Sequence, residues 1–124
     1  MDIKPPFKVI IAGSRSFWNK ELMRTKCDQI LKNKVETHDI HIISGTANGA
    51  DLLGESYAKE RGYKVMRFTP NWSMHGKRAG MIRNIEMLGH ADAVIVFWDG
   101  TSKGSKHMMS IAQEKGTPLR TIRF

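Results

Sequence analysis

Five short apolar segments separated by helical patterns are the feature that most constrains how this chain can fold. The segments expected to be strands are Lys8–Ala12, Ile40–Ser44, Lys64–Phe68, Ala93–Trp98 and Arg120–Phe124. Between them, apolar residues recur at helical spacing in Lys20–Lys32, Ala50–Arg61, Lys77–Leu88 and Ser105–Lys115. Strict alternation of strand and helix predicts a single α/β, Rossmann-like domain of three layers, with helices on both faces of a five-stranded parallel sheet.

The polarity of the strands indicates their order in the sheet. The first, second and fourth are almost entirely apolar, as strands buried on both faces must be. The third and fifth carry Arg67, Arg120 and Arg123, which are tolerated only near water. We therefore expect these two strands at the edges and the order 3-2-1-4-5. Ligands of such sheets bind at the carboxyl ends of the strands where the order reverses, here between strands one and four.

Length and composition bound the class of protein. The 124 residues are enough for one domain, which we expect to span residues 1–124 with residues 1–7 as an N-terminal extension. No run approaches the roughly 20 apolar residues that cross a membrane, and the first residues have no apolar signal core. The single cysteine, Cys27, lies at core spacing in its helix and excludes an internal disulfide. These features predict a cytoplasmic protein.

The net charge of +8, from 20 basic and 12 acidic side chains, favours an anionic partner. The basic residues are scattered along the chain, and aromatic residues do not alternate with them as in a single-strand binding groove. A small anionic ligand is therefore favoured over nucleic acid, and no membrane contact is expected. The five histidines lack metal-ligand spacing, so we expect no metal site.

The segment Val94–Ser105 carries the strongest functional signal. A buried strand, a glycine-bearing loop and a helix start follow one another there, as in α/β proteins that hold a phosphate or carboxylate. The first N–H groups of a helix have no intrahelical acceptor, and the helix dipole is positive at that end. The residues expected to meet the anion are Gly100, Thr101, Ser102, Lys103, Gly104 and Ser105.

Two further loops follow the first and second strands. The first contains Gly13, Ser14 and Arg15, and the second contains Gly45, Gly49 and Asp51. Arg15 could clamp a phosphate, although the loop could also be an ordinary turn from strand to helix. Asp51 could accept from a ribose hydroxyl or an amine, or could stabilise the start of its helix through the dipole.

The third helix begins with basic residues. Arg78, Arg83 and Asn84 could bind phosphate and read a base or ribose, or could lie on a solvated basic face. Helical geometry sets Arg83, Asn84 and Met87 opposite the apolar residues Met81, Ile82 and Ile85. The apolar pattern of this helix is Met81, Ile82, Ile85 and Leu88, and we expect the methionines at positions 81, 87, 108 and 109 to fill the core.

The long connection Thr69–Gly76 contains apolar side chains that are unusual in an idle loop. It could close over a ligand as a lid, or it could pack in an interface between copies of the chain. His75 is the one histidine that could take part in chemistry there. Trp72 in this segment and Trp98 at the end of the fourth strand are candidates for stacking on a ligand ring.

In sequence order, the motifs IAGSRSF, SGTANGAD, NWSMHGKRAGMIRNIEML and ADAVIVFWDGTSKGSKHMM resemble the YspA-type branch of the SLOG superfamily. This superfamily also includes the DNA-processing protein DprA and the LOG phosphoribohydrolases. The resemblance runs from about Lys8 to the C-terminus and implies a Rossmann-like sheet that binds or processes nucleotide-derived ligands. By position it implies ligand contacts at Gly13, Ser14, Arg15, Gly45, Gly49, Asp51, Arg83, Asn84, Gly100, Ser102, Gly104 and Ser105.

One departure from that resemblance bears on catalysis. The phosphoribohydrolases carry PGGxGTxxE, whose glutamate takes part in cleaving the N-glycosidic bond, and here Met108 stands in its place. A methionine cannot move a proton or stabilise an oxocarbenium ion. The residues left as catalytic candidates are Asp51, Asp99 and Arg83, and the sequence leaves open whether the protein is an enzyme.

Three functions follow from the sequence. The first is a sensor or sequestering protein for a nucleotide-like ligand such as AMP, ADP-ribose, an NAD-derived molecule or a cyclic nucleotide; no cofactor is firmly implied. The second is a hydrolase of nucleoside monophosphates, and the third is DprA-like binding of single-stranded DNA. Trp72 and Met74 give a weak indication of a homodimer or higher homo-oligomer.

Overall fold

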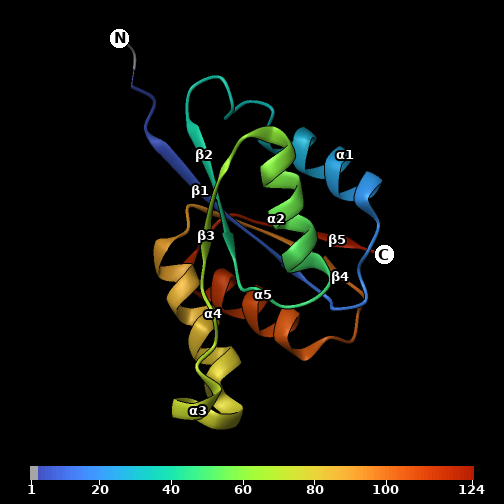
Figure 1. Cartoon of the computed structure of the whole chain (residues 1–124), viewed down its shortest axis with the longest axis vertical. Helices are drawn as coiled ribbons and strands as arrows, with labels where there is room; N and C mark the ends of the chain where they lie inside the picture. The colour runs from blue at the N-terminus through green and yellow to red at the C-terminus, as the bar shows by residue number, and fades with distance from the viewer. Residues whose placement is uncertain (1–2) are drawn as a thin grey trace.

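The computed structural model describes residues 3–124, in which strands and helices alternate along the chain (Figure 1). The strands are β1 (Pro6–Gly13), β2 (Asp39–Ser44), β3 (Lys64–Arg67), β4 (Ala93–Trp98) and β5 (Leu119–Arg123). The helices are α1 (Lys20–Leu31), α2 (Ala50–Arg61), α3 (Trp72–His75), α4 (Ala79–His90) and α5 (Lys103–Lys115), with a 3₁₀ turn at Gly76–Arg78.

The five strands form one parallel sheet in the order β3-β2-β1-β4-β5. This order confirms the arrangement that strand polarity predicts, with β3 and β5 at the edges. Arg67, Arg120 and Arg123 are exposed on those edge strands, as their charge requires. The central strand β1 pairs with β2 on one side and with β4 on the other, so the chain changes direction across the sheet between β1 and β4.

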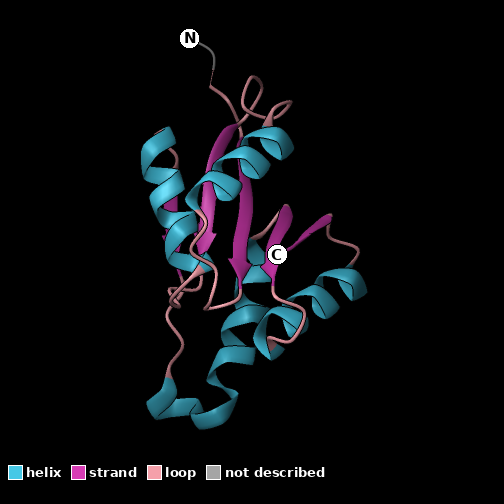
Figure 2. Ribbon diagram, turned by 90° about the vertical axis from the view of Figure 1, so that its right-hand side faces the viewer, coloured by secondary structure: helices cyan, strands magenta, loops and turns pink. Residues whose placement is uncertain are grey.

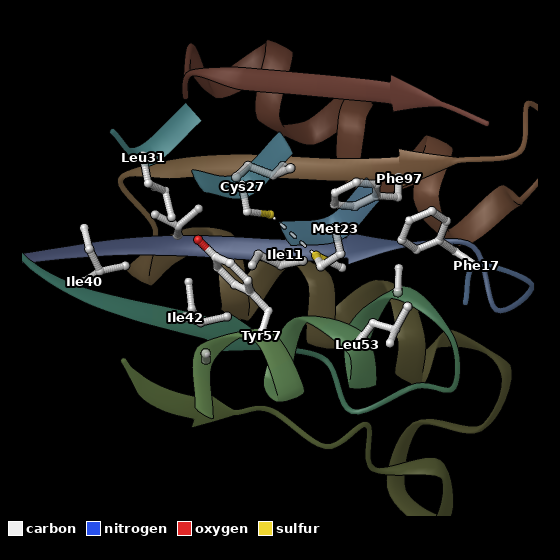
Figure 3. Close-up of a cluster of buried hydrophobic side chains, with 14 residues drawn as sticks. Ile11, Phe17, Met23, Cys27, Leu31, Ile40, Ile42, Leu53, Tyr57 and Phe97 are labelled. Carbon is white, nitrogen blue, oxygen red and sulfur yellow. Dashed lines mark hydrogen bonds between the residues drawn. The ribbon is translucent and has the colours of Figure 1, made fainter. Parts of the chain in front are cut away.

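Helices cover both faces of the sheet (Figure 2). Helices α1 and α2 pack over Val9 and Ile11 of β1, whereas α4 and α5 pack over Ile10 and Ala12, the alternate side chains of the same strand. Figure 3 shows the first of these cores. Cys27 is fully buried in it, and burial raises the pKa of its thiol to about 12. The expected role of Cys27 as a core residue is confirmed.

Several expected boundaries shift by one or two residues in the structure, and two of these shifts have a clear local cause. Strand β1 begins at Pro6, inside the expected extension of residues 1–7, because proline is tolerated at the first position of a strand. Met1 and Asp2 lie outside the described residues. The third long helix begins at Ala79 and not at Lys77, because Gly76, with a left-handed φ of +57°, ends the short helix α3 and residues 76–78 then form a 3₁₀ turn.

The orientation of α4 corrects another expectation. Met87 and Leu88 are buried, but Met81, Ile82 and Ile85 are 52%, 36% and 57% exposed. The expectation that Met81 fills the core is therefore wrong, whereas Met87 and Met108 are each 1% exposed. Helix α4 buries the side that carries Asn84, because the amide of this residue finds hydrogen-bond partners in α5.

None of the helices within residues 3–124 is long and apolar enough to cross a membrane.

Candidate ligand-binding cleft

A cleft of about 440 Å³ opens at the carboxyl ends of β1, β2 and β4, beside the point where the strand order reverses. Parallel α/β sheets bind ligands at this position because the loops and the first turns of helices converge there. The residues that line the cleft are Ala12, Gly13, Arg15, Ser16, Ala47, Asp51, Arg83, Asn84, Met87, Asp99, Ser102, Gly104, Ser105 and Met108.

The loop after β1 forms one wall. A Cβ on Gly13 would collide with the Phe97 carbonyl of β4, so only glycine fits there. Ser14 is 1% exposed, and its N–H donates to the same carbonyl at 2.9 Å. The Ser14 hydroxyl accepts from the N–H of Asp99 at 3.0 Å. Ser14 therefore joins the two loops that flank the cleft, and Arg15 is the member of this motif whose side chain is exposed at the opening.

The β2–α2 loop, residues 45–49, is held by close contacts with the rest of the fold. Gly49 has a left-handed φ of +81°, and a Cβ there would lie 2.5 Å from the carbonyl oxygens of Ser14 and Arg15. Thr46 also has a positive φ, +68°, which is uncommon for a β-branched residue. Its N–H donates to the Ser44 hydroxyl, which in turn donates to Glu55 of α2.

Asp51 and Arg83 are two charged residues of the cleft wall that the fold largely shields from water. Asp51 lies in the first turn of α2, is 5% exposed and accepts from the N–H of Ala47 at 3.1 Å. Burial raises the pKa of Asp51 to about 6, although the Ala47 hydrogen bond and the Arg83 charge oppose this shift. The Arg83 guanidinium is partly buried and donates from Nη1 to the Gly45 carbonyl at 2.6 Å. Desolvation lowers the pKa of Arg83.

Asn84 connects α4 to the start of α5. Asn84 is buried, with 6% of its surface exposed. Its Oδ1 accepts a hydrogen bond from Arg83 Nε at 3.1 Å, and its Nδ2 donates to the Gly104 carbonyl at 3.3 Å. The same amide nitrogen lies 3.1 Å from Nδ1 of His107. Burial lowers the pKa of His107, which favours the neutral ring that can accept this hydrogen bond. Adjacent side chains of α4 thus span the cleft from the β2–α2 loop to α5.

The β4–α5 loop, residues 99–102, is organised by its own side chains. Asp99 accepts from the N–H groups of Thr101 at 2.8 Å and Ser102 at 2.9 Å. These hydrogen bonds, that of Thr101 first, hold the pKa of Asp99 below its usual range. Ser102 caps α5, with its hydroxyl 2.9 Å from that of Ser105. Asp99 is therefore engaged as the loop's hydrogen-bond acceptor.

Trp98 also holds this loop. Its indole N–H donates to the Ser102 carbonyl at 3.1 Å, and the Arg123 guanidinium lies 5.5 Å from the centre of its ring. Trp98 does not line the cleft. Trp72 does not line it either; it lies in α3, which projects away from the sheet (Figure 2), and is 54% exposed. Its ring nevertheless approaches Gly80 on the side of α4 that carries Arg83.

The structure places half of the residues that the sequence singled out in the wall of one cleft and leaves the other half outside it. Those in the cleft wall are Gly13, Arg15, Asp51, Arg83, Asn84, Asp99, Ser102, Gly104 and Ser105. Those outside it are Ser14, Gly45, Gly49, Trp72, Arg78, Trp98, Gly100, Thr101 and Lys103. Lining residues that sequence reasoning did not select as ligand contacts are Ala12, Ser16, Ala47, Met87 and Met108. Helical spacing from Arg83 and Asn84 was the signal available for Met87.

The cleft has a polar rim and an apolar floor. Ala12, Met87 and Met108 are buried at its base, while Arg15 and Arg83 supply positive charge above them. Gly104 belongs to the first turn of α5, where backbone N–H groups lack intrahelical acceptors. No group of three or more His, Cys, Asp or Glu side chains within residues 3–124 is placed to hold a metal ion.

A Rossmann-like sheet with its cleft at the reversal of strand order defines a broad class of α/β binding proteins and enzymes. The chain belongs to the YAcAr family, the YspA, cpYpsA-related SLOG family, whose model matches residues 7–75. It is 34% identical over 123 residues to the Gene 61 protein of Mycobacterium phage D29, covering 90% of this chain and 93% of that protein.

Solved structures of low sequence identity share the fold. DNA processing protein A from Helicobacter pylori, described for its single-stranded DNA binding mode, is 23% identical with a TM-score of 0.71. The same protein from Streptococcus pneumoniae is 20% identical with a TM-score of 0.72, and the structural-genomics target TM1055 is 18% identical with a TM-score of 0.61. They match 94%, 97% and 94% of this chain. The matched regions span 65%, 51% and 72% of those chains.

Proposed function

We propose that the cleft binds a small nucleotide-derived anion, as a sensor or sequestering site. The observation that carries the proposal is the convergence of Arg15, Arg83 and the first turn of α5 around one cleft of about 440 Å³. This volume lies within the range of small-molecule sites. A helix N-terminus and two guanidinium groups are a strong combination for a phosphate, since backbone N–H groups and bidentate arginines both fit its oxygens.

The remainder of the cleft suits a nucleoside better than inorganic phosphate. Asp51 and Asn84 place a carboxyl and an amide in the cleft wall, and these groups suit a ribose hydroxyl or a base edge. The apolar floor of Ala12, Met87 and Met108 suits the face of a base or the carbons of a sugar. AMP, ADP-ribose, NAD-derived molecules and cyclic nucleotides all combine these chemical features.

Calorimetry against these ligands tests the proposal. We expect Arg83→Gln to weaken binding at least tenfold, because a charge-assisted hydrogen bond is lost. Arg120→Gln is the matched control, since it removes one exposed cation from β5 outside the cleft. Absence of binding by the folded protein, or equal weakening by both substitutions, would contradict the proposal.

Hydrolysis of the N-glycosidic bond is the second candidate function, and the environment of Asp51 favours it. This carboxyl is buried in the cleft wall with a pKa raised to about 6, so it can exchange a proton near neutral pH. In such a reaction water adds to the anomeric carbon, and the base departs with a proton. Chromatography of AMP incubated with the protein tests this function: free adenine and ribose phosphate should form, and should not form with Asp51→Asn.

Single-stranded nucleic acid is the third candidate, favoured by the net charge of +8. The likeness to Helicobacter pylori DNA processing protein A adds a precedent for DNA binding on this fold. Fluorescence anisotropy with a labelled oligonucleotide should then show affinity that falls steeply with salt concentration. Binding that AMP displaces would place both ligands in the cleft, whereas no binding at low salt would remove this candidate.

A further inference from the structure

Helix α4 carries an apolar face that the fold leaves uncovered. Asn84, Met87 and Leu88 face the core and the cleft, whereas Met81, Ile82 and Ile85 point away from them and are 52%, 36% and 57% exposed. In Figure 1, α4 lies at the outer margin of its layer, with α5 on its inner side. Three large apolar side chains on adjacent turns of one helix are unusual on a surface without a partner.

Two opposite charges border this face symmetrically. Arg78 directly precedes α4 with helical dihedral angles, and Glu86 lies two turns further on; both are exposed. Each is four residues from Ile82, so all three project from about the same side of the helix. The ion pairs found within residues 3–124 involve neither side chain.

We propose that this outer face of α4 is the interface of a homodimer, in which two copies of α4 pack antiparallel about a two-fold axis at Ile82. An antiparallel pair centred on that residue sets Arg78 of each copy opposite Glu86 of the other. Ile82 then meets its own equivalent, and Ile85 and Met81 lose contact with water. The face is complementary to itself, as an interface between identical subunits must be.

The charge pattern selects a second copy over an acidic partner. An acidic protein or a nucleic acid would be matched by a face bearing cations alone, and Glu86 would repel it at the edge of the apolar patch. In a two-fold symmetric dimer, Glu86 lies opposite Arg78 of the second copy, so the same carboxylate favours association. Arg78 was expected to bind ligand but lies outside the cleft, and this interface gives it a different role.

The size of the face sets the expected strength of the dimer. Helix α4 has 12 residues, which corresponds to a length of roughly 18 Å. A contact of this length lies at the small end of specific protein interfaces. We therefore expect a reversible, concentration-dependent dimer and not an obligate one. The interface and the cleft use opposite sides of α4, so the dimer does not depend on the identity of the ligand.

Sedimentation equilibrium over a wide range of protein concentration tests the proposal. We expect the natural sequence to change from monomer to dimer, and the double variant Ile82→Glu, Ile85→Glu to stay monomeric. Trp18→Glu is the control, because it places the same charge at an apolar side chain that is 57% exposed away from α4. Circular dichroism and thermal melting establish that each variant is folded. A natural sequence that stays monomeric, or a double variant that still dimerises, would overturn the proposal.

Charge reversal tests the antiparallel arrangement itself. Arg78→Glu and Glu86→Arg should each weaken the dimer about tenfold, because each creates two like-charge contacts across the axis. The combined variant restores opposite charges and should return the dissociation constant to within about threefold of the natural value. Failure of the combination to restore association would overturn this geometry.

Discussion

The β2–α2 loop and the β4–α5 loop border the same cleft, but they are held in place in different ways. The β4–α5 loop is organised from within, since Asp99 accepts two of its backbone N–H groups and Ser102 caps the helix that follows. The β2–α2 loop is held from outside, by Arg83 on the Gly45 carbonyl and by contacts of Gly49 with the loop after β1.

An anion site needs a helix start that faces the ligand and charged side chains placed beside it, and the two loops supply these separately. A loop organised mainly by its own side chains can present a helix start to a ligand, with Ser14 as an additional support from the loop after β1. The charged groups whose pKa values are shifted by burial, Asp51 and Arg83, belong to the region that depends on the rest of the fold. Substitutions in the β2–α2 region should therefore change mainly folding stability, and those in the β4–α5 region should change mainly binding.

The largest expected effect is that of Gly49→Ala. A Cβ would lie 2.5 Å from two carbonyl oxygens, and the left-handed φ of +81° is unfavourable for alanine. We expect the free energy of unfolding to fall by about 3 kcal/mol or more, measured by urea denaturation. If the free energy of unfolding falls by less than about 1 kcal/mol, the β2–α2 loop can shift away from the loop after β1. That result would contradict the statement that contacts with the rest of the fold hold this loop in place.

Asp51→Asn should have the next largest effect, and it should stabilise the protein. Because the folded-state pKa of about 6 lies above the ordinary 3.8, the contribution of Asp51 to stability is present below about pH 4 and is lost by about pH 6. The amide avoids this loss and can still accept from the Ala47 N–H. We expect a gain of up to about 3 kcal/mol at pH 7 that disappears near pH 4. Denaturation at both pH values measures it; a gain that is independent of pH would contradict the assignment.

Asp99→Ala should alter binding more than folding. The Asp99 carboxylate fixes the turn before α5 by accepting from the N–H groups of Thr101 and Ser102, and the substitution removes this acceptor. We expect AMP to bind severalfold more weakly by calorimetry, with a smaller loss of stability than in Gly49→Ala. Because hydrogen bonding lowers the Asp99 pKa, acid should bring the natural protein toward the variant only below the usual carboxyl range.

The smallest effect on stability is expected for Gly104→Ala. No atom lies within 4 Å of a Cβ at this position, and α5 has ordinary helical geometry there. Alanine should raise the free energy of unfolding by about 0.5–1 kcal/mol, because it favours the helix. If phosphate approaches this backbone closely, AMP binding should weaken at the same time. Weaker binding in a more stable protein would assign Gly104 to ligand contact, and unchanged binding would remove it from the site.

Much of the fold was predictable because strand polarity and helix periodicity report burial directly. The arginines of β3 and β5 identified the edges, and the order of strands then placed the glycine-bearing loops at one end of the sheet. Cys27 and Met108 are buried, as their spacing indicates. The convergence of Arg15, Arg83 and Gly104 on one cleft follows from the same topology.

The orientation of α4 was not predictable from its own residues. Periodicity separates Ile82 from Asn84, but it does not say which side meets the core. The outcome depends on the Gly104 carbonyl and His107 of α5, which satisfy the Asn84 amide and let it be buried. The short helix α3 was expected as a loop, although the Asn71 side chain caps it by accepting from the N–H of Met74.

Ser14 has a consequence for how fast a ligand can enter. Its backbone N–H and its hydroxyl tie the loop after β1 to Phe97 and Asp99, so two sides of the cleft are fixed to each other before any ligand arrives. A preformed wall removes the need for a closing motion of these segments during association. The association rate should then be limited by diffusion and by attraction to Arg15 and Arg83, and should fall as salt screens that attraction.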